Sequence, residues 1–138
     1  MHRYPLIVIL IFSLLPIFAC GGEPPAPSPA VTKVLALKAR IAEVVNDEER
    51  QAQVLKLADR MEKQVQKLES LTGSTRNKLF KTYSKKDSAP EDFEKILNKH
   101  SKKRIKTVNE LVALRMEMKQ LVSEEEWRRI AEGLEFVR

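Results

Sequence analysis

The chain has 138 residues, enough for one folded domain, and its 25 basic and 19 acidic residues give a formal net charge of +6. One cysteine excludes an internal disulfide, and two histidines leave no cluster that would hold a catalytic zinc ion. No glycine-rich phosphate loop and no glycine-flanked nucleophilic serine is present, so we expect neither an enzyme nor a bound cofactor or metal.

The first twenty residues have the layout of an export signal. Arg3 gives a positive start, residues 5–19 form an apolar run, and the small residue Ala19 precedes Cys20. The run is shorter than the ~20 apolar residues of a spanning helix, which favours cleavage over a permanent span. An uncleaved anchor and an ordinary signal peptide that ends near a cysteine by chance are the alternatives.

The segment Ile17-Phe18-Ala19-Cys20 resembles the lipobox of bacterial lipoproteins, with a bulkier residue than usual at Phe18. The resemblance implies removal of residues 1–19, lipidation of the Cys20 thiol and acylation of the new amino group. It thereby implies a protein held in the cell envelope by acyl chains such as palmitate. Because Gly21 is not aspartate, it further implies the outer membrane, facing the periplasm, in a host with two membranes; the inner membrane remains open.

Residues 20–30 form a proline-rich tether in this interpretation. Four prolines among ten residues disfavour a helix and predict an extended spacer, which could hold the domain up to about 30 Å from the bilayer.

Residues 31–138 are rich in helix-forming residues and show no alternating strand pattern. The predicted fold is therefore all-α, a small bundle of four or five helices. A first helical stretch covers 31–71, and a lapse of its apolar stripe favours a break near Asn46, which with Glu49 would form a capping box. One long helix is the alternative. Gly73 is expected to stop this stretch.

A short helix is expected over 75–85. Ser88 and Pro90 predict the start of a long helix that ends near residue 122, and Ser123 with Glu126 predicts a capping box for a last helix. We expect the aromatic and methionine side chains to fill the core rather than form a binding surface. They are Phe80, Tyr83, Phe93, Trp127, Met61, Met116 and Met118.

The positive charge is concentrated between residues 76 and 106, where eleven basic and four acidic residues give a net charge of +7. A solvated surface is one interpretation, and a surface that binds an anionic envelope component or an acidic protein is another. Nucleic acid is not expected as a partner, because no aromatic residues alternate with the basic ones. The candidate binding residues are Arg76, Lys78, Lys81, Lys85, Lys86, Lys99, Lys102, Lys103, Arg104 and Lys106.

Two features could be mistaken for an active site. His100 is expected to be partly buried or simply exposed on its helix rather than catalytic. Glu124, Glu125 and Glu126 fall in the first turn of the last helix, where carboxylates interact favourably with the helix dipole.

Residues 110–127 resemble the end of the Spy/CpxP-type periplasmic helical proteins. In that family a long helix leads to a Leu-Thr-x-x-Gln motif; Val122-Ser123-Glu124-Glu125-Glu126 stands in its place here, and Leu71-Thr72-Gly73-Ser74-Thr75 is a poorer candidate. Neither carries the glutamine. The resemblance implies a helical envelope protein that acts as a chaperone or stress sensor.

The leading hypothesis is a lipid-anchored, non-enzymatic interaction or adaptor protein that uses the basic helical surface. A chaperone or envelope-stress sensor of Spy/CpxP type and a pilotin-like assembly factor are the alternatives. The partners expected are the membrane, through acyl chains on Cys20, and an envelope protein or anionic component; a homodimer is possible for so modest a core.

Overall fold

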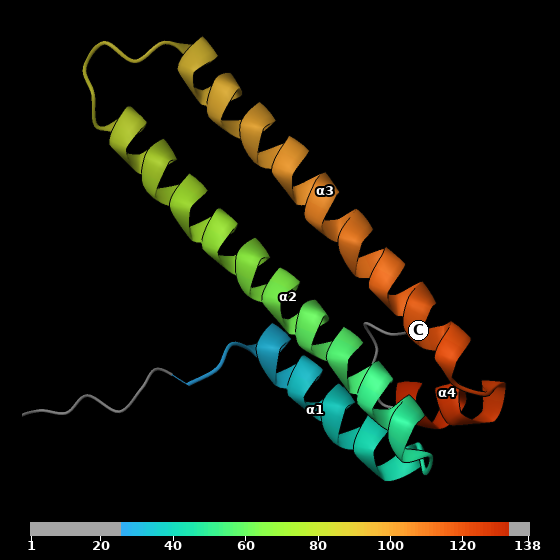
Figure 1. Cartoon of the computed structure of the whole chain (residues 1–138). Coiled ribbons are helices and arrows are strands. Elements are labelled where there is room, and N and C mark those ends of the chain that lie inside the picture. The colour runs from blue at the N-terminus through green and yellow to red at the C-terminus, as the bar shows by residue number, and fades with distance from the viewer. Residues whose placement is uncertain (1–25, 133–138) are drawn as a thin grey trace, which may run out of the picture.

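The computed structural model describes residues 26–132, which form four helices and no strand (Figure 1). The prediction of a small all-α bundle is confirmed. The expected signal peptide and Cys20 lie outside the described residues. No described helix combines the length and the apolar character that crossing a bilayer requires. The helices are α1 (Pro29–Val44), α2 (Glu48–Tyr83), α3 (Pro90–Leu121) and α4 (Glu124–Ala131).

Helix α1 begins inside the segment that was expected to be tether. Ser28 is its N-cap and accepts a hydrogen bond from the Val31 backbone N–H at 3.2 Å, and Pro29 is the first helical residue. Proline is tolerated there because the first amides of a helix have no intrahelical acceptor. The expectation that the prolines exclude helix up to residue 30 is therefore wrong for the last two residues.

A short turn separates α1 from α2, and this confirms the break predicted near Asn46. The cap falls one residue later than expected: Asp47 accepts a hydrogen bond from the Arg50 backbone N–H at 2.8 Å. The Gln51 side chain donates to the carbonyls of Ala42 and Val45, at 3.0 and 2.8 Å. These bonds satisfy carbonyls at the end of α1 and fix the direction in which α2 leaves.

Helix α2 continues through Gly73, where a stop was predicted. The prediction of a separate helix over 75–85 is also wrong. The Thr72 and Ser74 hydroxyls donate to the carbonyls of Leu68 and Leu71, at 2.9 and 3.0 Å, within the helix. A glycine in a helix interior costs only about 1 kcal/mol, which packing against α3 on both sides of this point outweighs.

The connection between α2 and α3 uses Ser88 differently from the sequence prediction. Its hydroxyl donates to the carbonyls of Thr82 and Lys85 and so caps the end of α2. Ala89 is the N-cap of α3, with its backbone N–H bonded to Asp92 at 3.3 Å, and Pro90 is the first helical residue as expected.

The hydrophobic core lies at one end of the molecule. Leu37 and Ile41 of α1 are fully buried against α2, and Leu114 and Met118 of α3 close the core from the other side. Burial of each such side chain stabilises the fold by roughly 1.5–3 kcal/mol. Ile130 of α4 completes this cluster.

Helix α4 is held against this core by its cap and by polar bonds. Ser123 and Glu126 form the predicted capping box, and Glu126 also accepts two hydrogen bonds from the Arg50 guanidinium, at 3.1 and 3.3 Å. Arg40 donates to the Arg129 carbonyl at 3.2 Å. We call the part of the molecule built by α1, α4 and the adjoining ends of α2 and α3 the proximal end.

Helices α2 and α3 run antiparallel and extend well beyond the proximal end as two helices alone (Figure 1). The Ser28 hydroxyl bonds to Glu69 where α1 begins, and Lys67 pairs with Glu110 at 3.8 Å near the same level. We call the part beyond this level, residues 70–106, the distal hairpin.

Candidate interaction surface

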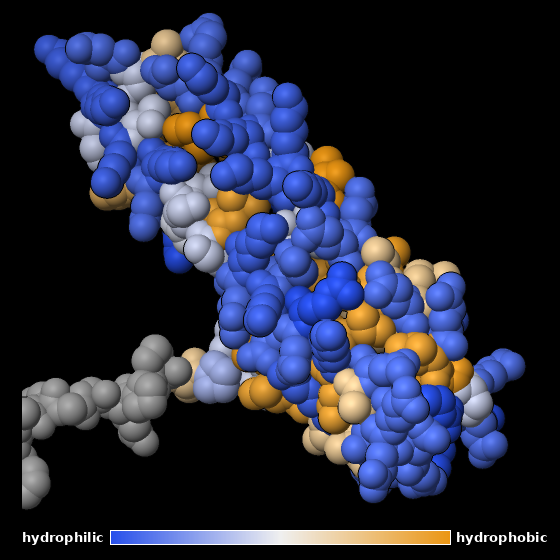
Figure 2. All heavy atoms as spheres, in the orientation of Figure 1, coloured by the Kyte–Doolittle hydropathy of each residue, from blue (hydrophilic) through white to orange (hydrophobic). Residues whose placement is uncertain are grey.

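The antiparallel pairing of α2 and α3 brings the candidate basic residues of both helices to the distal hairpin. Arg76, Lys78 and Lys81 occupy the last turns of α2, and Lys85 and Lys86 lie in the connection. The remaining five lie on α3, between Lys99 and Lys106. All ten are exposed, and hydrophilic residues cover much of the hairpin in the face shown by Figure 2. Cys20, the candidate lipidation site, is outside the described residues.

Several charges in the proximal end form ion pairs that join two helices. Lys38 bonds to Asp59 at 2.6 Å and to Glu62, and these carboxylates raise its pKa above the usual value. The pKa of Glu126 is lowered, because the Ser123 backbone N–H and the Arg50 guanidinium both donate to its carboxylate.

Charges in the distal hairpin are not paired in this way. None of the ten candidate residues forms an ion pair with another residue of the described range 26–132. Their side chains are therefore available to an outside anion, and their mutual repulsion adds to the attraction for it.

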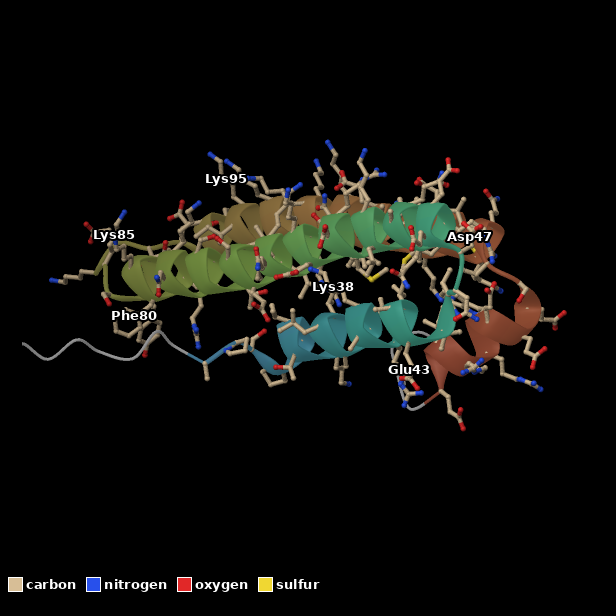
Figure 3. All side chains as sticks on the ribbon, turned by 60° about the horizontal axis from the view of Figure 1, so that its bottom comes forward. Lys38, Glu43, Asp47, Phe80, Lys85 and Lys95 are labelled. Atoms are coloured by element: carbon tan, nitrogen blue, oxygen red, sulfur yellow. The ribbon has the colours of Figure 1, made fainter. Side chains whose placement is uncertain are left out.

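The lysines of α3 share one face of that helix. Lys95, Lys99, Lys102 and Lys106 recur at spacings of three and four residues, which places them on one side, and Lys103 borders them. Figure 3 shows Lys95 pointing away from the side on which α1 lies. We call these five lysines the basic face.

Arg104, although it is one of the candidate binding residues, does not belong to the basic face. It follows Lys102 by two residues, so the helical turn places it about 200° around the axis, on the opposite side. Lys95 belongs to the basic face, although it was not among the candidate residues.

A row of exposed apolar side chains runs along another side of α3. Ile105, Val108, Val112 and Met116 are exposed, and their spacing of three and four residues places them on one face. Ile105 follows Lys102 by three residues, about 60° short of a full turn, so this face adjoins the basic one on the side away from Lys103. We call these four residues the apolar stripe.

The expectation that Phe80 and Tyr83 belong to the core is wrong. Their side chains are 70% and 78% exposed, because no third helix of residues 26–132 extends along the distal hairpin to cover them. Trp127 is partly buried and packed against the core, as predicted. Met61 and Met118 fill the core, whereas Met116 belongs to the apolar stripe.

The seam between α2 and α3 follows a seven-residue spacing, typical of an antiparallel coiled coil. None of the residues at this spacing is exposed. Its members in α2 are Val54, Met61, Leu68, Thr75 and Thr82, and in α3 they are Phe93, His100, Thr107, Leu114 and Leu121. Most of these residues are apolar in the proximal end, whereas in the distal hairpin Thr75, Thr82 and His100 lie at this spacing, and His100 contacts Thr75 at 3.0 Å.

Two further features concern metal binding and the surface around Trp127. Within residues 26–132 no three His, Cys, Asp or Glu side chains could hold a metal ion together. A shallow hollow between the end of α3 and α4 is lined by charged residues around Trp127, with Arg115 and Lys119 at 5.8 and 5.9 Å from its ring centre. These contacts are cation–π interactions that hold the tryptophan in place.

Reasoning from the sequence missed the apolar stripe, although a signal for it is present. The apolar residues of 93–121 fall on two sides of one helix, and α2 covers only one of them. A sequence that places apolar residues on two faces predicts two neighbours for the helix, or one neighbour and an exposed face.

No protein-family model matches this chain, and neither the curated proteins nor the solved structures compared with it contain a match.

Proposed function

We propose that this protein is a lipid-anchored, non-enzymatic interaction protein of the bacterial cell envelope. Acyl chains on Cys20 would hold it at the membrane. The distal hairpin would present the basic face to an anionic envelope component or to an acidic surface of an envelope protein.

One observation carries the proposal: ten exposed basic residues gather in the distal hairpin and none forms an ion pair within residues 26–132, whereas several charges of the proximal end join helices. Lys38 and Arg50 serve the fold, since each joins two helices. Lys99, Lys102 and the other candidate basic residues form no ion pair within the described chain and are exposed. A concentration of unpaired charge of one sign attracts partners of the opposite sign and speeds their association.

The experiment reverses the charge of the basic face. The variant Lys99→Glu, Lys102→Glu, Lys106→Glu is compared with the wild type for capture of partners from solubilised envelopes. A matched control, Lys33→Glu, Lys56→Glu, Lys63→Glu, changes the net charge by the same amount on exposed positions of α1 and α2. We expect the first variant to lose its partner and the control to retain it.

Two results would refute the proposal. Equal capture by the wild type and the variant of the basic face would remove the role of that surface. A native chain with an intact N-terminus and an unmodified Cys20, measured by mass spectrometry, would remove the anchor.

The apolar stripe favours a second candidate function, a chaperone of the kind that the Spy/CpxP resemblance implies. Exposed apolar side chains beside a basic face could bind unfolded chains, which offer apolar and acidic segments together. Suppression of client aggregation would test it. The variant Ile105→Ser, Val108→Ser, Val112→Ser should abolish suppression, and failure of the wild type to suppress aggregation at excess would exclude this function.

A further inference from the structure

The tip of the distal hairpin combines positive charge with exposed aromatic rings. Residues 76–86 contain five basic residues and no acidic one. Among the large apolar side chains described as exposed, Tyr83 and Phe80 are the two most exposed. Aromatic rings beside lysine and arginine are typical of segments that enter the interfacial region of a bilayer.

The two rings lie on the side of α2 that α1 covers. Tyr83 follows Glu69 by two seven-residue repeats, so both residues face nearly the same way, and Glu69 is bonded to Ser28 at the start of α1. Figure 3 shows Phe80 pointing to the side on which α1 lies. The tip therefore presents its aromatic rings on the side from which the chain enters the fold.

The start of α1 is directed toward the tip. Because α1 runs antiparallel to α2, its first residue faces the end of the molecule that carries Tyr83. Tyr83 lies fourteen residues beyond Glu69, about 21 Å along the helix at a rise of about 1.5 Å per residue. The eight residue steps from Cys20 to Ser28, when extended, span about 25 Å. A bilayer that holds Cys20 is thus within reach of the tip.

We propose that the tip of the distal hairpin is a second membrane contact, which docks on an anionic bilayer. Phe80 and Tyr83 enter the headgroup region, and the neighbouring basic side chains contact lipid phosphates. The inference rests on the proposed function in one respect, that Cys20 holds the chain at a bilayer. The basic residues are Arg76, Lys78, Lys81, Lys85 and Lys86.

An anionic lipid surface suits this tip for two reasons. It takes up exposed aromatic rings that have no partner among the described residues, and it accepts long basic side chains without requiring a fixed geometry of them. The tip and the acyl chains would then act together, and two membrane contacts hold a protein more firmly than one.

The experiment measures sedimentation with lipid vesicles. The chain that begins at residue 20, with Cys20→Ser to prevent acylation, contains every described residue. We expect it to bind vesicles that contain phosphatidylglycerol, to lose binding at high salt, and not to bind vesicles of phosphatidylcholine alone. The variant Phe80→Ser, Tyr83→Ser should bind at least about tenfold more weakly, because both rings lose their burial in the interface.

Matched controls separate the tip from apolar surface in general. Leu35→Ser, Met116→Ser removes two exposed apolar side chains from the proximal end and should bind as the parent does. In the same chain, Phe80→Cys labelled with an environment-sensitive dye should shift its emission to shorter wavelength on binding. The same dye on Lys56→Cys should not shift.

Three results would overturn the inference: no binding to anionic vesicles, equal binding of the tip variant and its parent, or a dye at residue 80 that stays in water. Binding of soluble polyanions without binding of vesicles would assign the tip to another class of partner and would equally overturn it. Because this chain carries no acyl group, its result is independent of whether native Cys20 is lipidated. The experiment therefore distinguishes an error in the proposed lipidation of Cys20 from an error in the proposed membrane contact of the tip.

Discussion

The Thr75 hydroxyl lies 3.0 Å from Nδ1 of His100, in the seam that joins the two helices of the distal hairpin. Thr75 is buried and His100 is half-buried, so the bond replaces water for both groups. Polar residues in a coiled-coil seam fix the register of the helices at some cost in stability. We infer that this pair sets the alignment of the distal hairpin, and with it the arrangement of the basic face.

The first prediction concerns this pair. Thr75→Val should lower the free energy of unfolding by about 1 kcal/mol, because the imidazole loses its partner in a half-buried site. The double variant Thr75→Val, His100→Leu should be at least as stable as the wild type, since apolar side chains then meet in the seam. Urea unfolding of both single variants and the double variant gives the coupling. Additive losses would show that the two residues do not act as a pair.

The second prediction concerns Gly73, which lies inside α2 although its sequence context predicts a helix end. A Cβ atom placed there meets no atom within 4 Å, so alanine fits without strain. Gly73→Ala should raise the free energy of unfolding by about 0.5–1 kcal/mol, through better helix propensity and a less flexible unfolded chain. The midpoint of urea unfolding measures this. A loss of stability would mean that α2 ends at this residue after all.

Helix boundaries in this protein were predictable where a side chain satisfies the end of a helix, and unpredictable where packing decides. The Ser123–Glu126 box and the break near Asn46 could be read from the sequence, because capping is local. The continuation of α2 through Gly73 could not be read from the sequence. It depends on packing against α3 before and after this residue, and that contact exists only in the folded protein.

The candidate surface was predictable in position but not in arrangement. The concentration of charge between residues 76 and 106 is visible in the sequence. Whether Phe80 lies in the core or in water depends on whether a third helix extends that far. Helix α1 begins at the level of Glu69, so nothing among the described residues covers the rings beyond it.

The third prediction compares two leucines that the sequence pattern treats alike. Leu37 is fully buried among α1, α2 and the neighbouring core, whereas Leu97 is 49% exposed on the distal hairpin. Leu37→Ala should lower the free energy of unfolding by about 2–5 kcal/mol, because it leaves a cavity. Leu97→Ala should change it by no more than about 0.5 kcal/mol. Thermal unfolding followed by circular dichroism measures both; similar losses would contradict a core confined to the proximal end.

The last prediction concerns acid and the contact that joins α4 to α2. The pKa of Glu126 is lowered in the folded state, because the Ser123 backbone N–H and the Arg50 guanidinium both stabilise its ionised form. A group with a lowered pKa contributes stability at pH values above its unfolded pKa, here about 4.5, and this contribution disappears as the pH falls through the folded pKa.

The variant Glu126→Gln tests this, because it keeps the shape of the side chain but removes the charge. The variant should therefore be less stable than the wild type near neutral pH, and the gap between their melting temperatures should close as the pH falls below 4.5 and through the lowered pKa of Glu126. A gap that stays constant over this range would mean that the bonds of Glu126, rather than its charge, hold α4 in place. Glu125→Gln is the control. The exposed Glu125 side chain lies in the same first turn, so this variant measures only the interaction of a carboxylate with the helix dipole.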